Sequence, residues 1–254
     1  MNSTPSSHLH ILYLQIRDDA MTRAEELQAF ARYSQLTPQQ FTILNVFDRP
    51  HFAPQSIDGY DALFIGGSSD ASVLDPQTYP FVEPAKALLI YCVENSIPVF
   101  ASCFGFQLVV EALGGKVILD TDRMEMGIYP IELTEAAQTD LLFHDATNGF
   151  LAVSGHKERA SILPAGVTLL AKTELCPYHA LKIDGKPFYG FQFHPEVDHN
   201  VLETRISRYR DRYLKTEQHL EEILSNLHPT PEAHSLLYKF VNRVLLRSQA
   251  TDFN

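Results

Sequence analysis

The sequence predicts an α/β fold in which helices cover both faces of a mostly parallel sheet, a three-layer α/β/α arrangement. Up to Gly115, short apolar runs alternate with segments of helical periodicity. The apolar runs end in polar or glycine-containing turns, which is typical of buried parallel strands joined by helices. Beyond Gly115, short strand-like runs follow one another without helices, so we expect a β-rich insertion there.

The first half predicts four strands and three helices. In chain order they are a strand over 8–16, a helix over 20–33, a strand over 41–46, a strand over 62–65, a helix over 80–95, a strand over 97–101 and a helix ending near 113. Gly114-Gly115 ends the last helix, because glycine is a poor helix former and a good C-cap. The order of these elements favours a flavodoxin-like sheet.

The second half predicts six further strands and then helices. The strands are expected over 116–119, 127–133, 150–153, 167–171, 179–183 and 188–193. Asp184-Gly185-Lys186 predicts a hairpin turn between the last two. Apolar residues at helical spacing follow from Val201, namely Leu202, Ile206, Tyr209, Tyr213, Leu220, Ile223 and Leu227. Thr230 as N-cap and Pro231 at the first position predict a last helix.

These elements indicate one α/β domain over residues 8–201 and a C-terminal helical extension over 202–249 that packs on it. The 254 residues carry a formal net charge of -11, which argues against a nucleic-acid partner because phosphate binding needs clustered Lys and Arg. The N-terminus lacks a signal-peptide pattern, and no segment has the roughly 20 apolar residues of a membrane span. The three cysteines indicate free thiols. We therefore expect a cytoplasmic protein with no membrane contact and no disulfide.

Cys103 occupies the most informative position in the sequence, between a predicted strand and a predicted helix. The N-terminus of a helix favours a thiolate through its free N–H groups and its dipole. A single cysteine can equally be an inert core residue, since free cysteine is among the most buried residue types. Other residues at the same edge of the sheet must therefore decide its role.

Two other loops follow the carboxyl ends of predicted strands, where the ligands of doubly wound sheets bind. Gly66-Gly67 would let backbone N–H groups approach a ligand, as an oxyanion hole requires, although an ordinary turn has the same sequence. His194 and Glu196 follow the last strand. A core histidine and a solvated glutamate are the alternative, but together with Cys103 they match a nucleophile, its base and the group that orients the base.

The motifs around these residues resemble those of the class I glutamine amidotransferases, whose signatures are G-x-C-x-G-x-Q and F-H-P-E. The corresponding segments are Ala101-Ser102-Cys103-Phe104-Gly105-Phe106-Gln107 and Phe193-His194-Pro195-Glu196. Similar segments extend the resemblance over roughly residues 8–201: Phe64-Ile65-Gly66-Gly67-Ser68, Gly114-Gly115-Lys116-Val117, Glu125-Met126-Gly127, Ser154-Gly155-His156-Lys157-Glu158 and Cys176-Pro177-Tyr178. The chain resembles the glutaminase domain of GMP synthase and would be a free-standing member of the family.

The resemblance implies a role for each matching residue. Cys103 would be the nucleophile, His194 the general base and acid, and Glu196 its orienting carboxylate. The N–H groups of Gly67 and Phe104 would form the oxyanion hole. Gln107 would hold the amino-acid end of the substrate, with Ser69 and His156 as neighbours. The implied reaction is hydrolysis of the γ-carboxamide of glutamine through a γ-glutamyl thioester, with release of ammonia and without a cofactor.

Two departures from the family pattern concern the same loops. Ala101 replaces the glycine usual two positions before the nucleophile, which crowds a tight turn. Gly66-Gly67-Ser68-Ser69 replaces the frequent G-G-P-G, which affects substrate contacts made by the fourth position. Catalysis by the triad is compatible with both.

Three functions remain open at this point: glutamine hydrolysis, γ-glutamyl peptide hydrolysis by the same triad, and ligand binding without catalysis. In the first, a separate synthetase subunit would receive the ammonia. The C-terminal helices would pad the sheet or form a homodimer contact. His8 and His10 have no ligand-type neighbours at metal-site spacing, so we expect no metal. The basic cluster of Arg205, Arg208, Arg210 and Arg212 alternates with acidic residues, so we expect a solvated helix face rather than an anion site.

Overall fold

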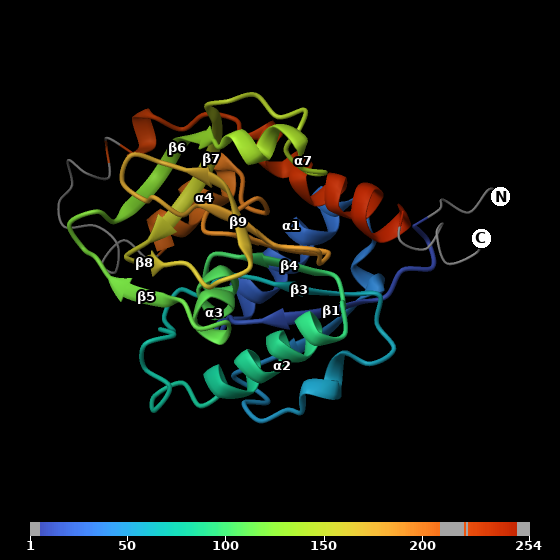
Figure 1. Ribbon diagram of the computed structural model, residues 1–254. Coiled ribbons are helices and arrows are strands. Elements are labelled where there is room, and N and C mark those ends of the chain that lie inside the picture. The colour runs from blue at the N-terminus through green and yellow to red at the C-terminus, as the bar shows by residue number, and fades with distance from the viewer. Residues whose placement is uncertain (1–5, 209–220, 222, 248–254) are drawn as a thin grey trace.

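The computed structural model describes residues 6–208, 221 and 223–247. Within this part of the chain, the main sheet has nine strands in the order β2-β1-β3-β4-β11-β10-β9-β6-β7 (Figure 1). The pairs β1–β2, β1–β3, β3–β4 and β4–β11 are parallel. The pairs from β11 to β7 are antiparallel. The predicted α/β fold with a parallel central part is therefore confirmed.

The strands have the following bounds: β1 Ile11–Gln15, β2 Phe41–Asn45, β3 Ala62–Ile65, β4 Val99–Ser102, β5 Lys116–Leu119, β6 Glu125–Leu133, β7 Phe150–His156, β8 Glu158–Ile162, β9 Val167–Lys172, β10 Ala180–Ile183 and β11 Phe188–Phe191. The helices are α1 Ala20–Ser34, α2 Val82–Glu94, α3 Phe104–Ala112, α4 His199–Arg208 and α7 Pro231–Phe240. The chain continues from α7 as a π-helical turn, Val241–Leu245.

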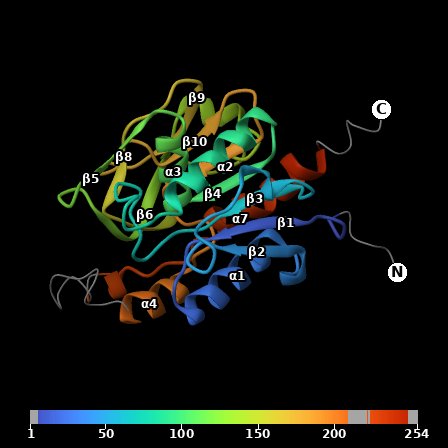
Figure 2. The ribbon, with the colours of Figure 1, turned by 90° about the horizontal axis from the view of Figure 1, so that it is seen from below.

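Helices cover both faces of the parallel strands, as Figures 1 and 2 show: α1 and α7 lie on one face, and α2 and α3 lie on the other. Successive residues of β1 alternate between the two cores. Tyr13 lies in the core that contains Phe30 of α1 and Phe240 of α7, and Leu14 lies in the core that contains Leu88 of α2. This alternation with burial on both sides explains why the first strands are continuous apolar runs.

The second half is β-rich, as predicted, and its strands pair with one another antiparallel, while β11 also pairs with β4 in parallel. Gly185 lies in the turn between β10 and β11 with φ of +69°, a conformation that glycine adopts without strain. Strand β8 was not predicted. It pairs with β5 in a separate two-stranded sheet and contains Glu158 and Arg159, so its sequence lacks an apolar pattern.

Helix α7 begins after Thr230, as predicted, but the Thr230 side chain does not cap the helix backbone. Its hydroxyl lies 3.0 Å from Nε2 of His234 instead. The predicted apolar positions Tyr209, Tyr213 and Leu220, and Arg210 and Arg212 of the basic cluster, fall outside the described residues. Among the helices that are described, none is long and apolar enough to span a membrane.

Candidate active site

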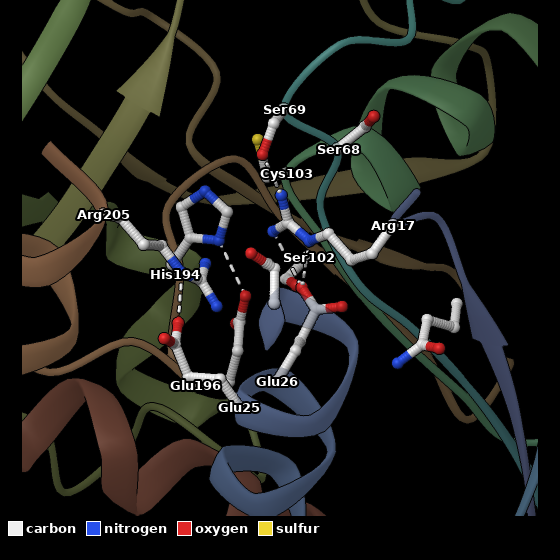
Figure 3. Close-up of polar contacts among 12 residues, drawn as sticks. Arg17, Glu25, Glu26, Ser68, Ser69, Ser102, Cys103, His194, Glu196 and Arg205 are labelled. Atoms are coloured by element: carbon white, nitrogen blue, oxygen red, sulfur yellow. Dashed lines mark hydrogen bonds and ion pairs between the residues drawn. The ribbon is translucent and has the colours of Figure 1, made fainter. Parts of the chain in front are cut away.

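Three loops meet at one edge of the sheet because the strands before them are parallel neighbours. Ile65 of β3 pairs with Ala101 of β4, which pairs in turn with Gly190 of β11. The loops that follow contain Gly67, Cys103 and His194, whose neighbourhood Figure 3 shows. The register therefore brings together residues that are far apart in the sequence, as the predicted topology requires.

Cys103 forms the turn between β4 and α3 with φ 48° and ψ -99°. Positive φ is unusual for a non-glycine residue, and such a conformation costs about 1–3 kcal/mol. Two backbone hydrogen bonds hold it: Cys103 N donates to Phe191 O at 2.7 Å, and Gln107 N donates to Cys103 O at 3.1 Å. The thiol is thus fixed at the start of α3.

The methyl group of Ala101, the departure noted in the sequence, is accommodated by Gly105. A Cβ atom on Gly105 would lie 3.2 Å from Ala101 Cβ and 2.9 Å from Ile65 Cβ. Both distances are shorter than ordinary van der Waals contact. The space left by Gly105 therefore lets the first turn of α3 pack on β3 and β4 with alanine at position 101.

His194 and Glu196 are connected directly: His194 Nδ1 lies 2.7 Å from Glu196 Oε1. This contact assigns Nδ1–H to the carboxylate and leaves Nε2 for the thiol. Burial lowers the pKa of His194, but the charges and hydrogen bonds of Cys103 and Glu196 outweigh it and raise the pKa to about 10. Burial raises the pKa of Glu196, and the neighbouring His194 outweighs that effect, so the pKa is lowered.

Gly67 lies against the imidazole and the nucleophile. A Cβ atom there would be 2.7 Å from His194 Cε1, 3.0 Å from Arg17 Nη2 and 3.5 Å from Cys103 Cβ. Only glycine fits this position without displacing a neighbour. Phe104 is the first residue of α3, where backbone N–H groups have no partner within the helix. Both predicted oxyanion donors are therefore beside Cys103.

The loop 66–69 is supported by a buried ion pair that the sequence did not reveal. Arg17 follows β1, and its Nη2 lies 2.8 Å from Glu26 Oε1 of α1 (Figure 3). Its Nη1 donates to Ser69 Oγ at 2.8 Å. Glu26 also accepts a short hydrogen bond from Tyr13. Its carboxylate lies 2.9 Å from where Gly66 would carry a Cβ atom, so glycine is required there too.

A cavity of about 430 Å³ opens at the thiol. Of the predicted site residues, Ser69, Cys103, Phe104, Gln107 and His156 line it. The Gln107 side chain is engaged in the wall, because Nε2 donates to the Glu158 carbonyl oxygen at 2.8 Å. Gly67 and His194 are not among the lining residues of this cavity.

His156 is held by a buried carboxylate. Glu125 Oε2 lies 3.0 Å from Nε2 of His156 and 2.6 Å from Nε2 of His179. Burial raises the pKa of Glu125, but these imidazoles outweigh it and lower the pKa well below its usual range. Burial lowers the pKa of His156. The buried residues His156, His179 and Cys176 each have a potential metal-ligand atom within 4.8 Å of the others, and Nε2 of both histidines contacts Glu125.

A second, smaller cavity of about 50 Å³ is lined by His194 together with, among others, Arg17, Arg205, Leu202 and Ile206. The expectation that Arg205 belongs to a solvated helix face is therefore wrong. Arg205 Nε lies 2.7 Å from Glu25 Oε1, and its side chain is 11% exposed. Charge on Arg205 also helps to lower the pKa of Glu196.

The other two cysteines differ from Cys103 in their surroundings. Cys92 lies in α2 within the apolar core, and Cys176 lies in a loop. Burial raises the pKa of each thiol to about 12. A thiolate is the reactive form of cysteine, so neither is a candidate nucleophile. All three cysteines are free, as expected.

Several site residues escaped the sequence prediction. Arg17 could have been found, because it follows β1, the parallel neighbour of β3, at the same edge of the sheet. Gln192 lies directly before the F-H-P-E segment, and its Nε2 is 3.9 Å from Cys103 Sγ. Glu26 gave no signal, since a single acidic residue in a helix normally faces solvent. Glu125 belongs to a segment that resembles the family, but its burial against two histidines was not predicted.

Comparison with known proteins places this geometry in a family. The family model "Glutamine amidotransferase class-I" matches residues 28–210. A GMP synthase [glutamine-hydrolyzing] from Chromobacterium violaceum is 35% identical over 175 residues, which cover 64% of this chain and 30% of that protein. Another from Shewanella amazonensis is 40% identical over 117 residues, which cover 43% of this chain and 22% of that protein. The chain thus spans less than a third of these curated relatives.

Two solved structures share the fold over almost the whole chain. A glutamine amidotransferase from Thermotoga maritima aligns with a TM-score of 0.74 at 20% identity, covering 94% of this chain and 99% of that one. A glutamine amido transferase from Methylobacillus flagellatus aligns with a TM-score of 0.71 at 19% identity, covering 92% and 95%. Together with the family model, which matches most of the sequence, these findings show that the chain belongs to the class I glutamine amidotransferase family.

Proposed function

We propose that this protein hydrolyses the γ-carboxamide of glutamine through Cys103, His194 and Glu196. The observation that carries the proposal is the meeting of the Cys103 and His194 loops at the carboxyl edge of the sheet, with 2.7 Å between His194 Nδ1 and Glu196 Oε1. A thiol needs such a base and a group that orients the base. Family membership supports the same chemistry.

The reaction would begin with attack of Cys103 Sγ on the amide carbon of the substrate. His194 would take the thiol proton, and its raised pKa favours the imidazolium that results. The N–H groups of Gly67 and Phe104 would stabilise the tetrahedral oxyanion, and loss of one such donor typically costs about 3–4 kcal/mol. Collapse of the intermediate breaks the C–N bond, His194 protonates the leaving nitrogen, and ammonia departs.

The remaining γ-glutamyl thioester would be hydrolysed by water. His194, now neutral, takes a proton from the water as it attacks the thioester carbon, and glutamate leaves as the C–S bond breaks. Glu196 keeps the imidazole in the tautomer that presents Nε2 in both steps. Gln107, Ser69 and His156 would contact the amino-acid end of the substrate from the walls of the large cavity.

A γ-glutamyl peptide is the second candidate substrate, and the size of the cavity favours it. The volume of about 430 Å³ falls within the roughly 300–1,000 Å³ of small-molecule sites, which bury most of a drug-sized ligand. Asp70, Lys157 and Glu158 line it and would meet the charged ends of a second residue. Assays with glutamine and with γ-glutamyl dipeptides separate the two: turnover of dipeptides alone would refute the glutaminase proposal.

We expect this reaction to take place in the cytoplasm. The ammonia would either be used by a separate synthetase subunit or be released into solution. Co-purification of a stoichiometric synthetase and a rise in glutamine turnover on its addition would support the first outcome. Alternatively, the C-terminal helices would form the interface of a homodimer. Sedimentation of the pure protein tests this alternative. The reaction proposed requires no metal, cofactor or nucleic acid.

A further inference from the structure

The segment between His194 and Glu196 is held from the C-terminal helix. Nδ1 of His234, in the first turn of α7, lies 2.7 Å from the carbonyl oxygen of Pro195. Pro195 is the single residue between the proposed base and its orienting carboxylate. Because a carbonyl oxygen only accepts hydrogen bonds, Nδ1 of His234 carries the proton.

The imidazole of His234 is itself fixed on two sides. Its Nε2 lies 3.0 Å from Thr230 Oγ1, so the hydroxyl donates to the unprotonated nitrogen. The ring stacks on Tyr33 of α1, with 3.9 Å between the centroids and 7° between the planes. Tyr33 in turn donates to Asp198 Oδ2 at 2.7 Å. The segment 194–198 is thus contacted from α1 and α7 together.

The charged groups around the ring are Asp198, Glu196 and Arg32. The acidic neighbours raise the pKa of His234, Arg32 lowers it, and burial, the largest effect, leaves it below the usual value. A neutral ring agrees with the tautomer that the two hydrogen bonds assign. His234 therefore acts as a hydrogen-bond donor of fixed direction rather than as a charge.

The family match does not account for this contact. The match ends at residue 210, and α7 spans Pro231–Phe240 within the proposed C-terminal extension. Yet α7 packs into the same core as α1 and the central strands, with Leu236, Leu237 and Phe240 fully buried. Helix α7 is consequently a rigid base from which a side chain can hold the catalytic loop.

We propose that His234 is a positioning residue of the catalytic loop. Its Nδ1–H fixes the Pro195 carbonyl and thereby the direction in which His194 faces Cys103 and Glu196 faces His194. Without this donor, the Pro195 carbonyl oxygen would lose its hydrogen bond, and the loop that carries His194 and Glu196 would change its position. A displacement of about 1 Å in such a group can lower the rate roughly 100-fold.

Two substitutions separate positioning from packing. His234→Asn places an amide N–H near the position of Nδ1 but removes the ring. His234→Phe keeps a ring that stacks on Tyr33 but removes the donor. Tyr238→Ala, on the exposed side of the same helix, is the control for changes in α7 alone. Thr230→Val is the mildest variant, because it removes only the hydroxyl that orients the His234 ring.

The kinetic readout depends on the proposed hydrolase function. We expect His234→Phe to lower kcat roughly tenfold, with KM for glutamine within about twofold because the cavity lining is unchanged. We expect His234→Asn to stay within about threefold of the parent kcat. A parent-like kcat in His234→Phe together with a loss in His234→Asn would show that the ring only packs, and would overturn the proposal.

A second readout needs no substrate. The rate of Cys103 alkylation by iodoacetamide as a function of pH reports how His194 interacts with the thiol, whichever amide the protein cleaves. We expect the midpoint of this profile to shift in His234→Phe, to shift less in Thr230→Val, and to stay in place in His234→Asn and Tyr238→Ala. An unchanged midpoint in His234→Phe would refute the positioning role. Should His234→Phe fail to fold, an unchanged midpoint in Thr230→Val would do the same.

Discussion

Arg17 and Glu26 form a buried ion pair, with 2.8 Å between Nη2 and Oε1, directly beneath the loop that is expected to supply an oxyanion donor. The same guanidinium donates to Ser69 at the end of that loop. A charge pair in this position links β1 and α1 to the loop after β3. The ion pair supports the loop rigidly. Such support matters because hydrogen-bond donors stabilise a transition state when they are held in place beforehand.

Replacing one partner of this pair should destabilise the protein strongly. We expect Arg17→Met or Glu26→Gln to lower the free energy of unfolding by about 3–5 kcal/mol, because the remaining charged or polar group stays buried without its partner. The double variant should cost less than the sum of the two single variants. Urea unfolding measures all three, and strict additivity would show that the pair is not coupled.

Gly67→Ala tests whether the loop must approach the imidazole. The added Cβ atom would lie 2.7 Å from His194 Cε1, so either the ring or the loop has to move. We expect a loss in kcat of roughly 100-fold, the usual effect of losing one oxyanion donor, with little change in the melting temperature. Wild-type turnover in Gly67→Ala would contradict the need for glycine beside the His194 ring.

The raised pKa of His194 predicts a pH-dependent stability. The pKa of about 10 in the folded protein lies above the ordinary value of 6.5, so His194 contributes stability that is fully present below pH 6.5 and is lost as the pH rises through about 10. His194→Gln should flatten the dependence of the unfolding free energy over this interval. Cys103→Ala should lower the pKa of His194, which NMR titration of the ring measures. A His194 titration that is identical in Cys103→Ala and the parent would contradict the pairing.

Glu196 and His194 should differ in their effect on the rate. Glu196→Gln keeps an oxygen near Nδ1 and affects mainly the orientation of the ring, whereas His194→Ala removes the base itself. We therefore expect the larger loss in kcat from His194→Ala. Initial rates with the preferred γ-glutamyl substrate compare them, and a reversed order would contradict the roles.

Much of the site could be predicted because topology and motif agree. Parallel strands bring their carboxyl ends together, and the register Ile65–Ala101–Gly190 places the loops of Gly67, Cys103 and His194 side by side. Gly66 and Gly67 indicate that the backbone passes close to other groups. The sequence did not show that these groups are Glu26 and His194. These features could be predicted because each depends on a short stretch of sequence: a strand followed by its loop, or a pair of glycines.

The unpredicted residues depend on contacts between distant segments. Glu26 is buried only because Arg17 and Tyr13 pair with it, and nothing in the helical pattern of α1 distinguishes it from its exposed neighbours. Arg205 became part of a cavity wall because Glu25 of α1 lies opposite. His234 lies 39 positions beyond Pro195 and gave no motif. Such pairs are fixed by the packing of α1, α4 and α7, which single-sequence patterns do not encode.

The most direct test of the account is the covalent labelling of Cys103 by an electrophilic glutamine analogue, followed by intact mass and peptide mapping. We predict a single adduct on Cys103, slowed by glutamine or a γ-glutamyl peptide, and lost together with hydrolysis in a folded Cys103→Ser variant. Labelling of Cys92 or Cys176 in place of Cys103, or undiminished hydrolysis by Cys103→Ser, would contradict the proposed nucleophile.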